Sequence, residues 1–254
     1  MPCQPTLPML WIANLQRINE GASHLLALLS PAEKARRLRF RYAADQQRFM
    51  VGRALTRLAI ASQLSCLPQE IGIVITTSGK PELDPNPATL TFSISHSGDL
   101  VVLALVAEGT VGVDVERIAP EVAPDLMMPL VCSLLESNGI NSLPSHKQQV
   151  ERFLSLWTLK EAYLKATGVG LATDPREVVF EFDAQGQPAL LEPPEGTRCG
   201  QFRDRWRFIV MPDYGQYVLA LAVHNTSGHV DSALTPLWGD ADTLLASAGG
   251  ISER

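Results

Sequence analysis

Residues 111–117 read VGVDVER, and this stretch is the best guide to how the chain folds. Its three valines alternate with a glycine and two carboxylates, which predicts a β-strand with one apolar face and one acidic face. Asp114 and Glu116 then lie on the same face, about 7 Å apart. Carboxylates at this spacing repel each other unless a positive charge lies between them, and an oxygen-only pair favours a hard cation such as Mg²⁺. The alternative is an amphipathic strand whose acidic face is solvated.

The segments before this strand predict two helices and several strands. Ser30, Pro31 and Glu33 supply a side-chain cap, a first-turn proline and a capping-box glutamate, so a short helix is expected over 31–39. Apolar residues at helical spacing predict a long amphipathic helix over 43–65. Apolar runs separated by turn residues predict strands over 71–76, 89–95, 100–107 and 110–117, and the last three are expected to form an antiparallel meander.

The segments after the strand repeat this order. Residues 119–150 predict a loop, a short helix and a second loop, and residues 151–167 predict a strong helix that ends at Gly168. Three further strands are expected over 177–182, 205–211 and 217–224. The predicted fold class is therefore α+β, with two pseudo-symmetric halves that each pack a long helix on a small antiparallel sheet. We place these halves at 1–112 and 113–225, followed by a loosely attached tail at 226–254.

The composition excludes several classes of protein. The chain has 254 residues, of which 46% are hydrophobic and 19% charged, as in globular proteins rather than disordered or fibrous ones. Its net charge of −6 argues against a dedicated nucleic-acid binder, because affinity for the phosphate backbone comes from an excess of Lys and Arg. The four cysteines form no C-x-x-C pair, and the longest apolar run, residues 100–107, is too short to span a bilayer. We expect a cytoplasmic protein that binds neither nucleic acid nor a membrane.

Three segments suit the binding of an anion. KARRLRFR at 34–41 holds the densest positive charge, which fits either a phosphate site or a solvated helix face. FSISHSG at 92–98 runs from a strand into a turn, where hydroxyls, an imidazole and free N–H groups suit a phosphate, although such residues are also ordinary in turns. GKP at 79–81 adds one lysine on a turn.

The predicted helix over 151–167 contains a second acidic motif, WTLKEAYLK at 157–165. Glu161 and Lys165 lie one turn apart on the same face, as in a surface ion pair that contributes only about 0.2–0.5 kcal/mol. The apolar residues around them, Phe153, Leu156 and Leu164, indicate instead that this helix is mostly buried.

Together these motifs resemble the Sfp-type 4'-phosphopantetheinyl transferases. GVDVE at 112–116 and WTLKEAYLK match the family signature in sequence and separation, and GKP and FSISHS match its upstream elements, so the resemblance spans about residues 30–225. It implies an Mg²⁺-dependent enzyme that binds coenzyme A in the cleft between its two halves. This enzyme would transfer phosphopantetheine to a serine of an apo acyl or peptidyl carrier protein and release adenosine 3',5'-bisphosphate. Because the trimeric single-domain synthases are half this length, a monomer is expected.

The resemblance also implies roles for individual residues. Asp114, Glu116 and Glu161 would hold Mg²⁺ against the pyrophosphate of coenzyme A. Glu161 is the expected base for the carrier serine, directly or through water, and Lys165 would stabilise or protonate the departing oxygen. Contacts to the phosphates and the adenine end of coenzyme A are expected from Arg36, Arg48, Lys80, Ser95, His96 and Lys160.

Departures from the family pattern bear on ligand and carrier preference. Ser93 replaces the usual asparagine, and Phe49 follows Arg48 where a small hydroxyl residue can stand. Residues 127–137 are a weak counterpart of a Phe-rich helix that often takes part in carrier docking, with Glu136 near the place of its acidic residue. The pathway is therefore left open among lysine, fatty-acid, polyketide and nonribosomal-peptide biosynthesis. Two alternatives are a non-catalytic binding homologue and an unrelated metal-dependent phosphohydrolase, although the latter would not need both motifs at this separation.

Overall fold

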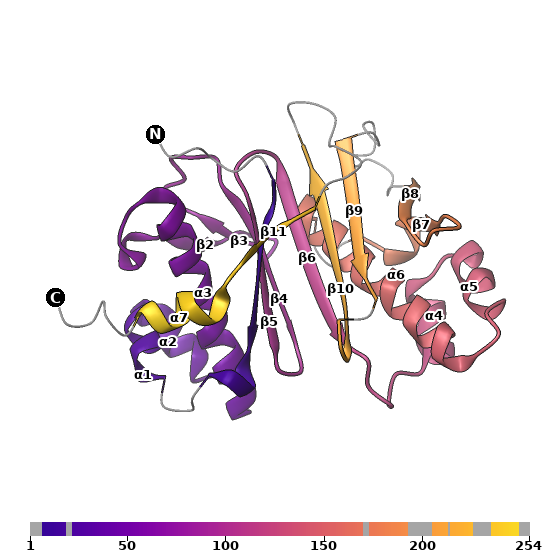
Figure 1. Cartoon of the computed structure of the whole chain (residues 1–254), viewed down its shortest axis with the longest axis horizontal. Helices are drawn as coiled ribbons and strands as arrows, with labels where there is room; N and C mark the ends of the chain where they lie inside the picture. The colour runs from indigo at the N-terminus through magenta and orange to yellow at the C-terminus, as the bar shows by residue number, and fades with distance from the viewer. Residues whose placement is uncertain are drawn as a thin grey trace. The chain divides into compact units, whose positions relative to one another are not determined.

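A computed structural model describes residues 7–18, 22–169, 173–192, 205–212, 214–225 and 235–248. The chain divides into two compact units, whose elements are labelled in Figure 1. The first unit comprises Met1–Thr76, Pro81–Ala107 and Thr235–Arg254, and the second comprises Thr77–Lys80 and Glu108–Leu234. In its described residues each unit packs a 22-residue helix on a small sheet, which confirms the predicted α+β class.

The first unit is built around one long helix and one sheet. In chain order its described elements are β1 (Met9–Asn14), η1 (Leu15–Arg17), α1 (Ser23–Ala27), α2 (Pro31–Arg37), α3 (Ala43–Leu64), η2 (Pro68–Glu70), β2 (Ile73–Ile75), β3 (Pro81–Leu83), β4 (Thr91–Ser97), β5 (Leu100–Val106), β11 (Leu237–Gly239) and α7 (Ala241–Ser247). The sheet has the order β11-β1-β5-β4, in which β1 and β11 run parallel and the other neighbours antiparallel. Helix α3 packs on β5 and supplies much of the apolar core.

The second unit repeats this pairing of helix and sheet. In chain order its described elements are β6 (Thr110–Arg117), α4 (Pro124–Val131), α5 (Leu134–Asn141), α6 (His146–Thr167), η4 (Pro175–Glu177), β7 (Val179–Phe182), β8 (Pro188–Glu192), β9 (Trp206–Met211) and β10 (Tyr217–His224). The antiparallel sheet β6-β10-β9 is covered by α6, which packs on β6 and β10. Tyr163 of α6 is fully buried, and its ring packs against the aromatic rings of Trp206 and Phe208.

A half-buried carboxylate joins α2 to α3 in the first unit. Glu33 Oε2 accepts from the backbone N–H of Ser30 at 2.9 Å, and the Ser30 hydroxyl accepts from the backbone N–H of Glu33, so the predicted capping box is confirmed. The same carboxylate accepts from Arg57 at 2.7 Å and lies 3.6 Å from Arg53. Burial acts to raise the pKa of Glu33, but the hydrogen bonds and the arginine charges outweigh it. The pKa therefore lies below its usual value.

Glu33→Gln is expected to lower the free energy of unfolding by about 2 kcal/mol at pH 7, because it leaves two arginines without their carboxylate. A depressed pKa means that the ionised carboxylate stabilises the fold above its unfolded value of 4.5, and that this contribution is lost as the pH falls through the lower folded-state pKa. Urea unfolding of the variant and of wild type at pH 7 and at about pH 3 measures this contribution. The difference between their free energies of unfolding should be smaller at the lower pH. Glu82→Gln, at an exposed carboxylate of the same unit, is the control. A difference that does not change with pH would contradict the prediction.

The predicted meander and the predicted boundary between the halves are wrong. The meander ends after β5, because β5 pairs with β1 and β4 whereas β6 pairs with β10 in the second unit. A boundary after residue 112 would cut β6 in two, and the units divide after Ala107 instead. Residues 119–150 hold two helices, α4 and α5, where one short helix is predicted, and α6 begins at His146, five residues before its predicted start.

The predicted loose tail is a structured part of the first unit over residues 235–248. Strand β11 pairs with β1, and α7 buries Ala241 and Leu245 in the core that contains α3. A Cβ on Gly239 would overlap the indole of Trp11, so β11 lies tightly against that side chain. The rest of the predicted tail, residues 226–234 and 249–254, lies outside the described residues.

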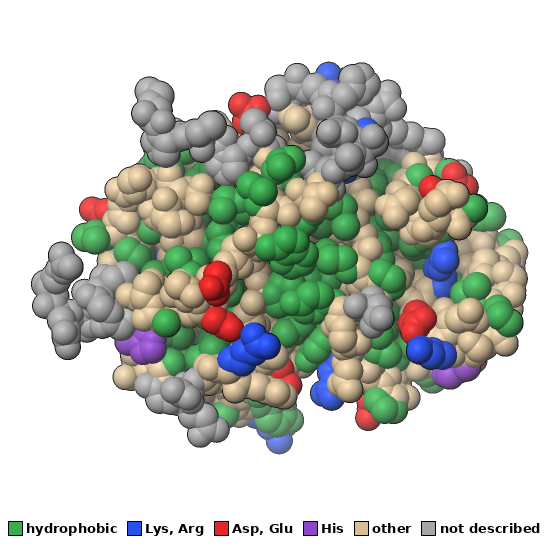
Figure 2. Space-filling view, viewed as in Figure 1, with side chains coloured by type: hydrophobic (Ala, Val, Ile, Leu, Met, Phe, Trp, Pro, Cys, Tyr) green, Lys and Arg blue, Asp and Glu red, His purple; other side chains and the backbone are tan. Residues whose placement is uncertain are grey.

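Charged side chains of both signs are mixed on the face of the molecule drawn in Figure 2, where they lie in small groups among hydrophobic and uncharged residues. One pair of opposite charges joins Arg17 to Asp242 at 3.3 Å. Within the described residues, no helix has the length and apolar character needed to cross a membrane.

Candidate functional site

The candidate site lies where α6 packs against β6 in the second unit. Trp157 donates its indole N–H to Glu116 Oε1 at 3.2 Å, and Lys165 donates to Asp114 Oδ1 at 2.6 Å. Glu161 lies between these two contacts, one helical turn from each. The structure thus brings the three predicted metal ligands to one place, with the predicted catalytic lysine beside them.

The periods of a helix and a strand explain this arrangement. Trp157, Glu161 and Lys165 are each four residues apart and share one face of α6, at about 6 Å per step. Asp114 and Glu116 share one face of β6, about 7 Å apart. Trp157 contacts Glu116, and Lys165, further along the helix, contacts Asp114, so helix and strand run in opposite directions. Glu161 therefore faces the space between the two strand carboxylates.

Gly112 allows β6 and α6 to approach this closely. It lies on the same face of the strand as the two carboxylates. A Cβ at this position would overlap the backbone carbonyl of Ala162 and lie 2.6 Å from the backbone nitrogen of Ala166. The glycine of the motif is therefore a packing requirement, since any side chain would separate the helix from the strand.

The acidic face of β6 is covered by α6 rather than solvated, so the alternative of an exposed acidic face is wrong. Asp114 is only 4% exposed. Burial raises the pKa of Glu161, the charges of Asp114 and Glu116 raise it further, and Lys165 opposes them, so the pKa lies above its usual value. The cluster therefore has more negative charge than its single lysine neutralises.

The chemistry of these donors fits a hard divalent cation. All three predicted ligands are carboxylates, and a cation would offset the repulsion that raises the pKa of Glu161. As the side chains stand, Lys165 holds Asp114 and Trp157 holds Glu116. No group of three or more His, Cys, Asp or Glu side chains in the described part of the chain is already arranged to hold a metal ion. Binding at this cluster requires the carboxylates to exchange their present partners for the cation, and the metal ligands stay a prediction.

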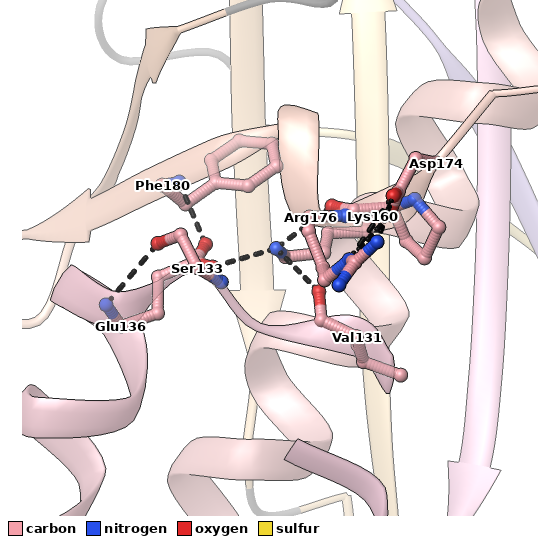
Figure 3. Close-up of polar contacts among 8 residues, drawn as sticks. Val131, Ser133, Glu136, Lys160, Asp174, Arg176 and Phe180 are labelled. Carbon is pink, nitrogen blue, oxygen red and sulfur yellow. Dashed lines mark hydrogen bonds and ion pairs between the residues drawn. The ribbon is translucent and has the colours of Figure 1, made fainter. Parts of the chain in front are cut away.

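The side chain of Lys160 is buried in the core of the second unit, where its polar contacts are made with Glu136 and with backbone carbonyls (Figure 3). Its ammonium donates to Glu136 Oε2 at 2.6 Å, to the carbonyl of Val131 at 2.9 Å and to that of Pro175 at 3.0 Å. An ammonium has three N–H groups, and all three are therefore used. The predicted contact between Lys160 and a phosphate of coenzyme A is wrong for this geometry, since the side chain has no exposed surface.

Arg48, Ser95 and His96 lie near one turn of the first unit. Arg48 donates from Nε to the carbonyl of Gly98 at 2.7 Å and forms an ion pair with Asp45 at 2.6 Å. Ser95 is buried and His96 is exposed, because they are successive residues of β4 and point to opposite faces. The start of α3 and the end of β4 thus meet at the turn where the sequence predicted phosphate contacts, which stay predictions.

Arg36 and Lys80 have separate surroundings. Arg36 is an exposed residue of α2, and the Cζ atom of its guanidinium lies 5.7 Å from the centre of the Phe49 ring. Lys80 belongs to the second unit, where its ammonium donates to the carbonyl of Ala166 at 3.1 Å, near the C-terminal end of α6. A helix C-terminus favours a cation, which accounts for the position of Lys80 without a ligand.

Two side chains that define the cluster and its surroundings are not predicted from the sequence motifs. Trp157 holds Glu116, and its place one turn before Glu161 was the available signal. The family pattern indicates only the position of Glu136, whereas in the structure its buried carboxylate accepts a hydrogen bond from Lys160.

Comparisons with known proteins match both parts of the sequence to one family. Residues 110–222 match the model of the 4'-phosphopantetheinyl transferase superfamily, and residues 16–108 match the model described as 4'-phosphopantetheinyl transferase, N-terminal. The first match contains all the residues of the cluster between α6 and β6.

Individual relatives agree with these models. A phosphopantetheinyl transferase of Thraustochytrium sp. is 30% identical over 85% of this chain and 77% of its own length, and a 4'-phosphopantetheinyl transferase of Bacillus pumilus is 33% identical over 69% and 73%. A putative 4'-phosphopantetheinyl transferase of Synechocystis sp. is 36% identical over 60% of this chain, which spans only 62% of that protein. Among solved structures, a Chronobacterium ammoniagenes ACPS-CoA complex has a TM-score of 0.37 and 23% identity over 46% of this chain and 96% of its own.

Two family models that cover successive parts of one chain define a transferase class. The chain belongs to the 4'-phosphopantetheinyl transferase superfamily. The superfamily and the enzyme class predicted from the four motifs are therefore confirmed.

Proposed function

We propose that this protein transfers the 4'-phosphopantetheine group of coenzyme A to a serine of an apo acyl or peptidyl carrier protein, with Mg²⁺ as its metal ion. The observation that carries the proposal is the cluster in which Glu161 faces Asp114 and Glu116 with Lys165 at its edge. The names of the relatives support the transferred group, since they are phosphopantetheinyl transferases. Adenosine 3',5'-bisphosphate is the second product.

Asp114, Glu116 and Glu161 are the residues that would hold Mg²⁺. When bound, the cation supplies positive charge to phosphate oxygens that become more negative during transfer. The protein positions its ligands through packing, because β6 and α6 hold them on two facing surfaces. Such preorganisation is the main contribution that a protein makes to phosphoryl transfer.

Glu161 and Lys165 are the candidates for moving protons and charge. The carrier serine attacks the phosphorus next to the pantetheine, and its proton passes to Glu161, directly or through water. The bond from that phosphorus to the bridging oxygen breaks, and the departing oxygen belongs to adenosine 3',5'-bisphosphate. Lys165 is 31% exposed in its side chain, so its ammonium can turn from Asp114 to stabilise or protonate this oxygen.

The remaining contacts with coenzyme A are proposed to come from Arg36, Arg48, Lys80, Ser95 and His96. Lys160 does not contribute such a contact, because its side chain is buried. We propose that the protein acts as a monomer in the cytoplasm. Its carrier would belong to lysine, fatty-acid, polyketide or nonribosomal-peptide biosynthesis.

The proposal is tested by incubating the protein with coenzyme A, Mg²⁺ and a panel of apo carrier proteins, and measuring carrier mass. We expect a carrier to gain the mass of one phosphopantetheine group. The gain should vanish when the acceptor serine is replaced by alanine or when a chelator removes Mg²⁺. If carriers from fatty-acid, polyketide, peptide and lysine pathways all keep their mass, a non-catalytic binding homologue becomes the better explanation.

A further inference from the structure

Lys160, which precedes Glu161 in the sequence, forms a buried ion pair that takes no part in the proposed reaction. The ammonium of Lys160 and the carboxylate of Glu136 are 2.6 Å apart, and neither side chain has any exposed surface (Figure 3). Lys160 also donates to the carbonyls of Val131, the last residue of α4, and Pro175, the first residue of η4. One side chain of α6 thus binds three oxygens from three other segments.

Glu136 extends this network to a strand and to a helix start. Its Oε1 accepts from the backbone N–H of Phe180 in β7 at 2.9 Å, and its Oε2 accepts from the backbone N–H of Ser133, the N-cap of α5, at 2.7 Å. The carboxylate therefore lies at a helix N-terminus and the ammonium at a helix C-terminus, where the helix dipoles stabilise their charges. Together the two side chains connect α4, α5, η4 and β7 to one point on α6.

The energetics of a buried ion pair indicate that it fixes the orientation of the segments it joins more than it adds to the stability of the fold. Replacing a buried ion pair by neutral groups of similar size is often nearly neutral, because the attraction between the charges is offset by their loss of hydration. Its hydrogen bonds are directional, however, and a buried ammonium that loses an acceptor is strongly disfavoured. Three acceptors on three segments therefore restrict the rotation of α6 at this point more than apolar contacts would.

We propose that Lys160, paired with Glu136, is a positioning residue that fixes the rotation of α6 so that Glu161 faces Asp114 and Glu116. Successive helix residues lie about 100° apart, so the anchored lysine determines where its neighbour points. A rotation of 30° would move a carboxylate about 3 Å, whereas a working site tolerates about 0.5 Å. The inference rests on the proposed function, because it takes the three carboxylates to be the metal ligands.

The test compares two double variants that each remove one ion pair of α6. Lys160→Met/Glu136→Gln neutralises the buried pair and leaves no unpaired charge behind. Lys147→Met/Glu151→Gln makes the same two substitutions in a surface pair of the same helix, where the charged atoms are 3.7 Å apart. Mn²⁺ binding followed by electron paramagnetic resonance, without coenzyme A or carrier, measures the metal site. Thermal unfolding reports on the fold.

We expect the buried-pair variant to stay folded, to bind Mn²⁺ about tenfold more weakly than wild type, and to lose a similar factor in kcat/KM, as is usual when support for a metal ligand is removed. The surface-pair variant should match wild type. If the folded buried-pair variant binds Mn²⁺ as tightly as wild type, or if the surface-pair variant loses as much affinity, the positioning role is overturned. Should the buried-pair variant not fold, Lys160→Gln/Glu136→Gln provides the same comparison, because it also removes both charges together and leaves neither buried alone.

If the proposed function itself is wrong, the Mn²⁺-binding measurements give a different pattern. In that case wild type itself would not bind Mn²⁺, or Glu161→Gln would bind it as tightly as wild type. The metal site would then be withdrawn, and the positioning role with it. A loss of affinity in Glu161→Gln together with no loss in the buried-pair variant would overturn the positioning role alone.

Discussion

Glu161→Gln is expected to reduce phosphopantetheine transfer by roughly 10³-fold, the scale seen when one preorganised charge-stabilising group is removed from an active site. The substitution removes a predicted metal ligand and the expected base while keeping the size of the side chain. It should not unfold the protein. Burial and the charges of Asp114 and Glu116 raise the pKa of Glu161, which means that its ionised form destabilises the fold at neutral pH. Without Mg²⁺, the variant should therefore unfold at the same temperature as wild type or at a higher one.

Carrier mass and thermal unfolding measure the two effects on the same sample. Glu151→Gln is a matched control, because it makes the same change on the same helix at a surface ion pair. Its activity should remain within about twofold of wild type, since surface pairs of this kind contribute little. Full activity in Glu161→Gln would remove Glu161 from the site. A large fall in its unfolding temperature would show that the carboxylate supports the fold instead.

Local signals in the sequence predicted the individual elements well. The helix start at Ser30 depends on groups within four residues, and the end of α6 at Gly168 depends on a glycine with φ of 74°. The alternating pattern of residues 111–117 likewise predicted β6. In each case the residues that determine the structure lie next to one another in the sequence, so their pattern can be recognised without knowledge of the fold.

The pairing of the strands could not be predicted in the same way. A turn at Glu108–Gly109 predicted a chain reversal, and Gly109 does adopt φ of 87°, but a turn does not determine which sheet each flanking strand joins. Strand β11 has three residues and pairs with β1 more than two hundred positions earlier, and so short a segment carries no recognisable alternation. Pairings of this kind depend on the whole core.

Contacts between residues far apart in the sequence also explain why only one of the two lysines of the motif at residues 157–165 has the surroundings that the sequence predicts. Residues four apart on a helix share a face, so the spacing predicts that Lys165 lies near Glu161, and the structure adds that its ammonium donates to Asp114. The family resemblance predicts that Lys160 contacts a phosphate, although the apolar residues around it predict a buried helix. Its actual partner is Glu136, on a different helix, and nothing in the spacing of the motif indicates that contact.

Gly112→Ala is expected to destabilise the protein by about 3 kcal/mol or more, at the upper end of the usual range for overpacking. Most overpacked side chains find relief by rotating, but here the added methyl would meet backbone atoms of Ala162 and Ala166, which cannot rotate away. Helix α6 must therefore move from β6. That movement would separate Trp157 from Glu116 and draw Glu161 away from its strand partners, so transfer should fall in any fraction that remains folded.

Urea unfolding measures this effect, and the control is the same substitution at Gly139 in α5. Gly139 is exposed, and a Cβ there would meet no atom within 4 Å. Because alanine is the better helix former, Gly139→Ala should raise the free energy of unfolding by about 0.5–1 kcal/mol. The same methyl group is thus expected to have opposite effects at the two glycines. If Gly112→Ala were as stable as wild type, helix and strand would not be in the close contact that places Glu161 opposite the carboxylates of β6.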